Sequence, residues 1–508
     1  MRKNVIVETP FPIYSVCLLG ESHFVIAGGG GQARTGVPNL IEAYAFELDS
    51  EDFISSLGRD SSHCLRAVKV HVKDTDSLAT MNMDVALVKY RNVDNTQSDE
   101  AQVQSKARKK YDKQTRNKGN KNSNTQYSND EMSSTGTIDE QETLLMDQFL
   151  IATGQDRFCK LYSLKFDIVG LQNGQIVPYL SIISNRGSAN SSPSIANRRR
   201  GSSPEQNLLG NNGIIKKIGF LLNDVRSVQT DSHPKSPFQK VVRLTRDCSK
   251  FVTGGADGHL RVWDVEAGGK LADRSAHKDD VDDIAISPDG KHFISIGRDK
   301  LAYVWRTADA SKVADIPNPP PDVPAKYLFR SVRFSCLGRG GYLFYTVSIP
   351  VIKQARGQVC YATQWILLHE SQQDGAAIPR VRPIKTVQTS AEVVSALSIS
   401  GCGRFLATGT MSGSVAIWDA LELRCLLRRP AIHDIFVTGL TFLPSQPQPS
   451  SIIAPFMLVN RACVLSIAAD NTVQVHALRR QYRTKGVVWS LAKMSMIVLT
   501  LSVLLGLA

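Results

Sequence analysis

Four consecutive glycines, Gly28 to Gly31, are the residues of this chain whose type and spacing most strongly suggest a binding function. Glycine tolerates positive φ and lets the backbone approach a partner closely, so such a run between two strands builds a shaped loop. The strand-like stretches 23–27 and 41–46 flank this loop, which continues through Gly36 to Asn39. We therefore expect the function to reside here, with a merely flexible hairpin tip as the alternative.

A nucleotide-binding loop is a second alternative, because Gly28, Gly30 and Ala33 fit a loose dinucleotide-binding pattern. That pattern requires a helix after the loop, since the N-terminus of the helix holds the pyrophosphate. Gly36 and Pro38 interrupt any helix start, and the chain then returns to a strand-like pattern without a βαβ repeat. The sequence therefore excludes a nucleotide-binding loop.

Motifs for covalent or metal-assisted chemistry are missing from the sequence. It contains no Walker A loop, no H-E-x-x-H, no G-x-S-x-G and no C-x-x-C, and its ten histidines are spread along the chain. The nine cysteines are scattered in mostly apolar strand-like stretches, which is typical of reduced core residues. We expect a protein that is not an enzyme in the covalent sense and that acts by binding a partner and changing its conformation.

A repeated β pattern indicates the scaffold that carries the loop. Each copy is a strand, a tight turn and a second strand that ends in an aromatic residue or histidine, and the best copies end in or near Trp-Asp. Copies that recur about every 40 to 45 residues are typical of the blades of a WD-type propeller. The clear copies are 251–264, 293–305 and 405–419, and the weaker ones are 149–162 and 465–476.

An aspartate lies six residues before the closing residue of four copies, where it can bond the backbone of the turn. We expect a structural role for these aspartates and for His277, which could be mistaken for catalytic residues. The four are Asp156, Asp257, Asp299 and Asp470.

The fold class predicted is all-β, a seven-bladed WD-type β-propeller over residues 1–478, followed by a single C-terminal transmembrane helix. Residues 4–8 are expected to close the ring by pairing with the last blade, and segment 213–231 is β-like but unassigned. Two polar insertions, 92–143 and 184–212, are expected to be disordered because they cannot bury enough apolar surface. The predicted blades are 12–48, 60–165, 237–266, 277–307, 327–370, 392–427 and 433–478.

The C-terminal segment 486–508 has 23 residues with one charge, Lys493. As a helix it would span roughly 34 Å, enough for a hydrocarbon core of about 30 Å. The basic residues of 479–485 precede it, as is usual on the cytoplasmic side of a membrane span. No signal peptide is visible, so we expect a tail-anchored protein with its propeller in the cytosol.

The net charge of +13 is partly explained by basic residues outside the expected core, in segments 198–200 and 479–485. Basic residues beside a membrane anchor meet anionic lipid headgroups, so no nucleic-acid partner is expected. The basic centre of insertion 92–143 has acidic flanks and few aromatics, which favours a solvated loop over an RNA or lipid contact.

These features together resemble one family, the endoplasmic-reticulum guanine-nucleotide exchange factors for the small GTPase that initiates coat complex II assembly. The resemblance covers the whole chain in architecture, and its specific motif is 27–31 followed by 35–39. It implies an endoplasmic-reticulum membrane protein whose first-blade loop contacts the GTPase and promotes GDP release and GTP loading in export-vesicle budding. It also implies a potassium ion bound in that loop.

The resemblance assigns roles to individual residues of the loop. Asn39 matches the family's key asparagine and would be a potassium ligand or a hydrogen-bonding residue of the loop. The GTPase-contact residues would be Val37, Pro38, Asn39, Leu40 and Ile41. The residues that shape the loop would be Gly28, Gly29, Gly30, Gly31 and Gly36.

Three other functions compete with this interpretation. A DNA-binding transcription regulator would suit the charge, but the chain lacks a helix-turn-helix or zinc-finger pattern and has an apolar tail. A phosphoinositide-binding propeller would carry a Phe/Leu-Arg-Arg-Gly motif, whereas Arg199-Arg200-Gly201 lies in an insertion and Leu427-Arg428-Arg429 precedes proline. A tail-anchored scaffold without exchange activity differs from the favoured function only through the glycine-rich loop.

Overall fold

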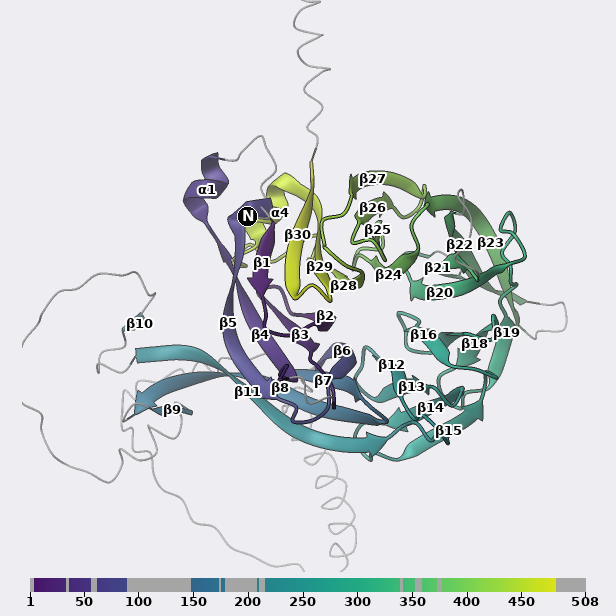
Figure 1. Cartoon of the computed structure of the whole chain (residues 1–508), viewed down its shortest axis with the longest axis horizontal. Coiled ribbons are helices and arrows are strands. Elements are labelled where there is room, and N and C mark those ends of the chain that lie inside the picture. Colours follow the sequence, from purple (N-terminus) through teal and green to yellow (C-terminus); the bar gives the residue numbers. More distant parts are fainter. Residues whose placement is uncertain are drawn as a thin grey trace, which may run out of the picture.

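The structure is a computed structural model in which seven antiparallel β-sheets surround a central axis as the blades of a propeller (Figure 1). This arrangement confirms the predicted all-β, seven-bladed architecture. The residues that the structure describes are 4–32, 36–55, 62–88, 148–172, 175–178, 208–209, 215–338, 341–351, 359–371 and 377–480.

The first three blades follow the chain from its N-terminal region. Blade 1 consists of β2 (Ile13–Leu19), β3 (His23–Gly28), β4 (Leu40–Leu48) and β5 (Leu65–Asp74). Blade 2 consists of β6 (Thr80–Val88), β7 (Gln148–Gln155), β8 (Phe158–Gln172) and β11 (Ile215–Gln229), with β9 (Gln175–Pro178) and β10 (Leu208–Leu209) at its edge. Blade 3 consists of β12 (Gln239–Leu244), β13 (Lys250–Gly255), β14 (His259–Asp264) and β15 (Lys270–Ser275).

The next three blades repeat the same meander of four strands. Blade 4 consists of β16 (Val281–Ile286), β17 (His292–Gly297), β18 (Ala302–Arg306) and β19 (Lys312–Asp315). Blade 5 consists of β20 (Tyr327–Phe334), β21 (Gly341–Pro350), β22 (Cys360–Ser371) and β23 (Ala377–Ser390). Blade 6 consists of β24 (Val394–Ile399), β25 (Phe405–Thr410), β26 (Val415–Asp419) and β27 (Arg424–Arg429).

The last blade joins the two ends of the described chain. Blade 7 consists of β28 (Val437–Phe442), β29 (Asn460–Ala468), β30 (Thr472–Arg479) and the N-terminal strand β1 (Val5–Glu8). β1 pairs antiparallel with β30, with Val5 opposite Gln474. The prediction that residues 4–8 close the ring is therefore confirmed.

Connections alternate between the two faces of the ring because each blade is an antiparallel meander. The connections between second and third strands, and those between blades, lie on one face, which we call the loop face. The connections between first and second strands and between third and fourth strands lie on the other, which we call the basal face. The basal connections of blades 1 and 7 carry the short helices α1 (Ser50–Ser55), η1 (Ser62–Cys64) and α4 (Ala454–Val459).

The inner strands are apolar along nearly their whole length because neighbouring blades cover both of their faces. In β13, for example, five of six residues are buried, whereas the outermost strand β15 of the same blade has none buried. Each fully buried large apolar side chain contributes roughly 1.5–3 kcal/mol. The tryptophan that closes a repeat packs on a phenylalanine of the neighbouring strand, as in Phe251 and Trp263, whose ring centroids are 5.9 Å apart.

The predicted blades 12–48, 60–165, 237–266, 277–307 and 327–370 all end too early, because each leaves out the outer strand of its blade: β5, β11, β15, β19 and β23. Blade 1 does not end at residue 48, because β5 pairs with β4 along its length and is the outer strand of that blade. Helices α1 and η1 lie between β4 and β5 in the sequence, so the sequence does not show that the two strands are neighbours in one blade. The unassigned segment 213–231 contains β11, which pairs with β8 as the outer strand of blade 2.

The other predicted segments lie mostly outside the described residues. Insertion 92–143 and the C-terminal segments 481–485 and 486–508 lie wholly outside them. Insertion 184–212 was expected to be loop throughout, but its residues Leu208–Leu209 form β10, which pairs with β11. Among the residues that the structure describes, none of the helices is long and apolar enough to cross a membrane.

The predicted structural role of the repeat aspartates is confirmed for three of the four. In blade 4, Asp299 accepts hydrogen bonds from the backbone N–H of Leu301 at 3.0 Å and of Lys278 at 3.0 Å, and it also bonds His277. The other His277 nitrogen bonds Ser295 Oγ at 2.9 Å, which accepts a hydrogen bond from Trp305. The carboxylates of Asp257 and Asp470 hold the turns of blades 3 and 7 in the same way. These polar groups therefore fix turns and are not a catalytic constellation.

Acid should destabilise the propeller because burial lowers the pKa of three of its histidines, His23, His71 and His277. Burial holds the pKa of His23 at about 4, and it lowers the pKa of His277 despite the nearby Asp299. A histidine whose folded pKa lies below its unfolded value of about 6.5 binds more protons when unfolded, so stability falls as pH drops below about 6.5. For His23 the loss between pH 7 and 5 should be at most about 2 kcal/mol. Denaturant unfolding at both pH values checks this, and His23→Gln should flatten the dependence. If the free energy of unfolding of His23→Gln depended on pH as strongly as that of the wild type, the effect assigned to His23 would be contradicted.

Candidate functional site

The connection between β3 and β4 is unusually long for this ring. In blades 3, 4, 6 and 7 the last strand pairs before the turn join residues six positions apart, such as Gly254 with Leu260. In blade 1 the corresponding pair, Gly28 and Leu40, is twelve positions apart. Blade 5 has a similarly long connection, but most of it lies outside the described residues. The glycine-rich segment 29–39 is thus an enlarged loop on the loop face.

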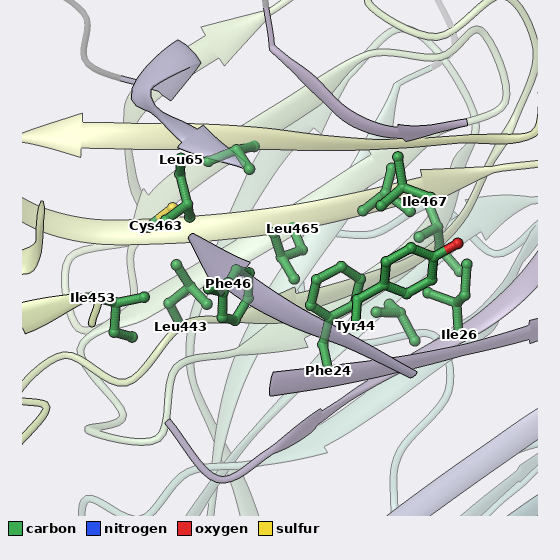
Figure 2. Packing of buried hydrophobic residues seen from close by; sticks show 14 of the residues in the cluster. Phe24, Ile26, Tyr44, Phe46, Leu65, Leu443, Ile453, Cys463, Leu465 and Ile467 are labelled. Atoms are coloured by element: carbon green, nitrogen blue, oxygen red, sulfur yellow. The ribbon is translucent and has the colours of Figure 1, made fainter. Parts of the chain in front are cut away.

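The strands that carry the loop are firmly packed. Phe24 and Ile26 of β3 and Tyr44 and Phe46 of β4 lie in one buried cluster with Leu465 and other residues of blade 7 (Figure 2). The rings of Phe24 and Tyr44 stack with centroids 5.3 Å apart. The loop therefore rises from a rigid base at the boundary between blades 1 and 7.

Asn39 holds the loop in shape from within. Its side chain is 5% exposed, and its Oδ1 accepts a hydrogen bond from the Gly31 N–H at 2.9 Å. Its Nδ2 donates to the carbonyl of Gly31 at 3.2 Å and to the carbonyl of Asp76 at 2.9 Å. The amide thus ties the two ends of the loop together and joins them to the connection that follows β5. The structure supports the hydrogen-bonding role that was one of the two expected of this residue.

Two of the glycines are required by close approach rather than by flexibility. A Cβ at Gly28 would lie 1.9 Å from the carbonyl oxygen of Pro12, and one at Gly29 would lie 2.2 Å from Asn39 Oδ1. Gly29 also has a φ of +141°. Gly31 and Gly36 have positive φ values of 73° and 76°, but a Cβ on either would meet nothing within 4 Å. Gly28 and Gly29 therefore shape the loop through packing, and Gly31 and Gly36 shape it through backbone conformation.

The five residues predicted to contact a GTPase differ in accessibility. Val37 and Pro38 are half-buried and lie in the loop itself, whereas Leu40 and Ile41 belong to β4. Ile41 is only 1% exposed and packs inside the core, so its side chain does not form a contact tip. Val37 and Leu40 pack against the cluster of blades 1 and 7. Val37, Pro38 and the loop backbone are therefore the groups that would contact a partner directly. Asn39 would act by holding the loop in shape.

The connection between β5 and β6 completes the site, and sequence reasoning missed it. The N–H and the hydroxyl of Thr75 both donate to the carbonyl of Asn39, at 2.9 and 3.1 Å. Asp76 has a φ of 60°, and its N–H donates to the carboxylate of Asp74 at 2.8 Å. The sequence could not show this contact, because the bond between the Asp76 carbonyl and Asn39 joins residues far apart in sequence.

A buried carboxylate lies below the loop, on β4. Glu42 is 1% exposed, accepts a hydrogen bond from the Tyr44 hydroxyl and pairs with Lys69 Nζ at 2.6 Å. Burial and this hydrogen bond raise the pKa of Tyr44, which therefore stays protonated at neutral pH. The group is fully partnered within blade 1 and serves the packing of the loop's base rather than chemistry. Within the described part of the chain, no group of three or more His, Cys, Asp or Glu residues could hold a metal.

Comparisons with known proteins agree with this architecture. The WD domain, G-beta repeat model matches residues 223–264, 268–306 and 381–419. The guanine nucleotide-exchange factor SEC12 of Mus musculus is 28% identical over 475 residues, which is 93% of this chain and 89% of that protein, and its Rattus norvegicus counterpart matches equally. SEC12-like protein 2 of Arabidopsis thaliana is 24% identical over 208 residues, which is 41% of this chain and 47% of that protein.

The fold and the matched repeats define a WD-repeat β-propeller with an enlarged, internally bonded loop on its first blade. Within that class the chain is similar to the rodent SEC12 proteins, and this similarity spans nearly the full length of both.

Proposed function

We propose that this protein is a guanine-nucleotide exchange factor, which promotes GDP release and GTP loading of the small GTPase that initiates coat complex II assembly. The observation that carries the proposal is the nearly full-length similarity to two proteins named as guanine nucleotide-exchange factors. The enlarged loop of blade 1 offers a site for such activity, because it is shaped from within and rises from a rigid base.

Exchange needs no acid, base or nucleophile from the propeller. A factor that binds the nucleotide-free GTPase more tightly than the GDP-bound form shifts the equilibrium toward GDP release by that difference in affinity. The described parts of the loop, 29–32 and 36–39, are suited to this task because Asn39 and Thr75 already hold them in place before binding. Val37 and Pro38 are the loop residues that would touch the GTPase.

We also propose that a potassium ion binds in this loop. Protein carbonyl oxygens bind potassium, and the loop is rich in them. Asn39 Oδ1 accepts one hydrogen bond, from Gly31, and a carbonyl oxygen has a second lone pair. The carboxylates of Asp74 and Asp76 add negative charge beside the loop. The loop therefore offers the type of ligand atom that potassium prefers, and Asn39 Oδ1 together with loop carbonyl oxygens would hold the ion. When bound, it would hold those carbonyls in position.

We place this activity at the cytosolic surface of the endoplasmic-reticulum membrane. The sequence supports this location through the apolar segment 486–508 and the basic segment 479–485 that precedes it. The described chain ends at Arg480, directly after strand β30 of blade 7, so the propeller would lie close to its own anchor.

A comparison of affinities tests the exchange proposal against the alternative of a scaffold. The full chain in detergent micelles should bind the nucleotide-free GTPase at least tenfold more tightly than the GDP-bound form, which corresponds to about 1.4 kcal/mol. Surface plasmon resonance with each form of the GTPase measures this ratio. Equal affinity for the two forms would favour a tail-anchored scaffold, because a ligand without differential affinity shifts no equilibrium.

A further inference from the structure

Large apolar side chains are exposed on the basal face at blades 1 and 7. Among the described residues, the two most exposed large apolar side chains are Leu458 on α4 and Ile54 on α1, at 68% and 66%. Ile452, in the same connection as α4, is 49% exposed. Exposed apolar side chains that gather at one place, rather than singly, indicate an interaction surface.

The two short helices that carry these side chains lie side by side. The rings of Phe53 on α1 and Phe456 on α4 pack with centroids 6.4 Å apart. Phe456 is fully buried, whereas the neighbouring Leu458 points out of the packed interior. The helices are close together near the N-terminus and β30 in Figure 1. The pair is thus fixed by its inner aromatic contact and offers its outer apolar side chains to another surface.

The described chain leaves the propeller at this place. The Arg480 N–H donates to the carbonyl of Val459, the last residue of α4, at 2.9 Å, and its Nε donates to the carbonyl of Asn460. The Ala477 N–H donates to Ser62 Oγ of η1 at 3.1 Å. These bonds fix the exit point between the two basal connections. The sequence that follows contains the apolar segment 486–508.

Positive charge borders the apolar side chains on the blade 7 side, whereas α1 carries the acidic residues Glu51 and Asp52. Arg461, Arg479 and Arg480 are exposed along the basal edge of blade 7. On α1 and beside it, Asp49 and Asp52 pair with Arg66 at 2.7 and 3.7 Å, which leaves Glu51 as an exposed opposing charge. An apolar surface bordered by arginines matches the interface of a bilayer that contains anionic lipids.

We propose that the propeller docks on the membrane through a basal patch, defined as Ile54, Ile452, Leu458, Arg461, Arg479 and Arg480. The apolar members enter the headgroup region, and the arginines meet anionic lipid headgroups. The proposal rests on the membrane anchoring given under the proposed function, and it adds an orientation to it. The basal face meets the bilayer, so the glycine-rich loop on the opposite face points away from the lipid and toward the cytosol.

Lipid quenching in reconstituted vesicles tests this orientation. The full chain with Cys336→Ser receives one environment-sensitive dye, either through Leu458→Cys on the basal face or through Met411→Cys on the loop face. Met411 is a matched control because it is apolar and 42% exposed. In vesicles with phosphatidylserine and nitroxide-labelled lipid, quenching at position 458 should exceed that at 411 at least threefold. High salt should weaken it, because salt screens the arginines.

Each outcome of this test decides between the proposals. Protein that floats with vesicles but shows equally weak quenching at both positions overturns the basal patch and leaves the anchor intact. Protein that fails to float overturns both the anchor and the patch. Dye shielding at 458 that grows with protein concentration, without lipid quenching, would indicate self-association instead and overturn the proposal.

A second pair of variants separates docking from simple proximity to the anchor. With the dye attached through Ile452→Cys, the double variant Ile54→Asp and Leu458→Asp should reduce lipid quenching at least twofold. The control Met411→Asp places one negative charge on the opposite face and should leave quenching unchanged. Unaltered quenching in the double variant would show that the anchor alone holds the propeller near the lipid.

Discussion

Replacing Asn39 by alanine should slow catalysed GDP release about 30- to 100-fold while the propeller stays folded. The substitution removes three hydrogen bonds, two to Gly31 and one to the carbonyl of Asp76. At roughly 1 kcal/mol each they contribute about 2–3 kcal/mol to the ordered loop. If binding of the GTPase requires the ordered loop, the complex loses the same free energy. Each 1.4 kcal/mol lost weakens the complex, and with it the release of GDP, about tenfold. Release of fluorescent GDP from the GTPase measures the effect.

Two companion variants make this result specific. Gln32→Ala changes an exposed residue of the same loop and should leave release within about twofold of wild type. Asn39→Asp keeps an acceptor for Gly31 but replaces the donor of two bonds with a charge, and should lose activity as Asn39→Ala does. Full exchange activity of Asn39→Ala, with an unchanged circular dichroism spectrum, would show that exchange does not depend on the loop that Asn39 holds.

Replacing Gly28 by alanine should destabilise the whole propeller, in contrast to the same change at Gly31. The new Cβ at Gly28 would lie 1.9 Å from the backbone oxygen of Pro12, which cannot rotate away as a side chain can. Overpacking of this kind costs about 3 kcal/mol. At an unfolding entropy of about 2.1 cal/mol/K per residue over roughly 400 residues, that is a fall of about 4 °C in the unfolding midpoint.

Gly31→Ala is the matched control for this prediction. Gly31 also has positive φ, at 73°, but a Cβ there would meet nothing within 4 Å. Only left-handed backbone strain remains, at about 1 kcal/mol. Thermal unfolding of both variants by circular dichroism tests the difference. Equal midpoints would mean that the contact between Pro12 and the end of β3 is not part of the folded structure.

The repeats could be predicted from the sequence because their signals are local. An aspartate and a tryptophan six positions apart, as in Asp257 and Trp263, lie on one hairpin, the aspartate in its turn and the tryptophan in its second strand, opposite Phe251. The glycine run was recognisable for the same reason. The outer strands β5 and β11 were misassigned because long connections separate them from their partners, and outer strands are less apolar.

The internal structure of the loop could not be predicted, because its contacts are not local. Asn39 could be matched to a family pattern, but its bond to the carbonyl of Asp76 and the bonds from Thr75 come from the next blade connection. The close approach of Gly28 to Pro12 is instead local, because Ile13 pairs with Gly28 in the hairpin of β2 and β3. Ile41 lies in a run of four buried residues, 41–44 of β4, which neighbouring blades cover on both faces.

Acceleration of GDP release by the intact protein tests the central claim most directly. The full chain, reconstituted in vesicles, is mixed with the coat-initiating GTPase loaded with fluorescent GDP, in potassium or in sodium buffer. Our account predicts release that is much faster than the intrinsic rate and faster in potassium than in sodium. Equal rates in the two buffers would contradict the proposed ion while preserving exchange. No acceleration by folded protein would contradict the exchange function itself and leave a tail-anchored scaffold.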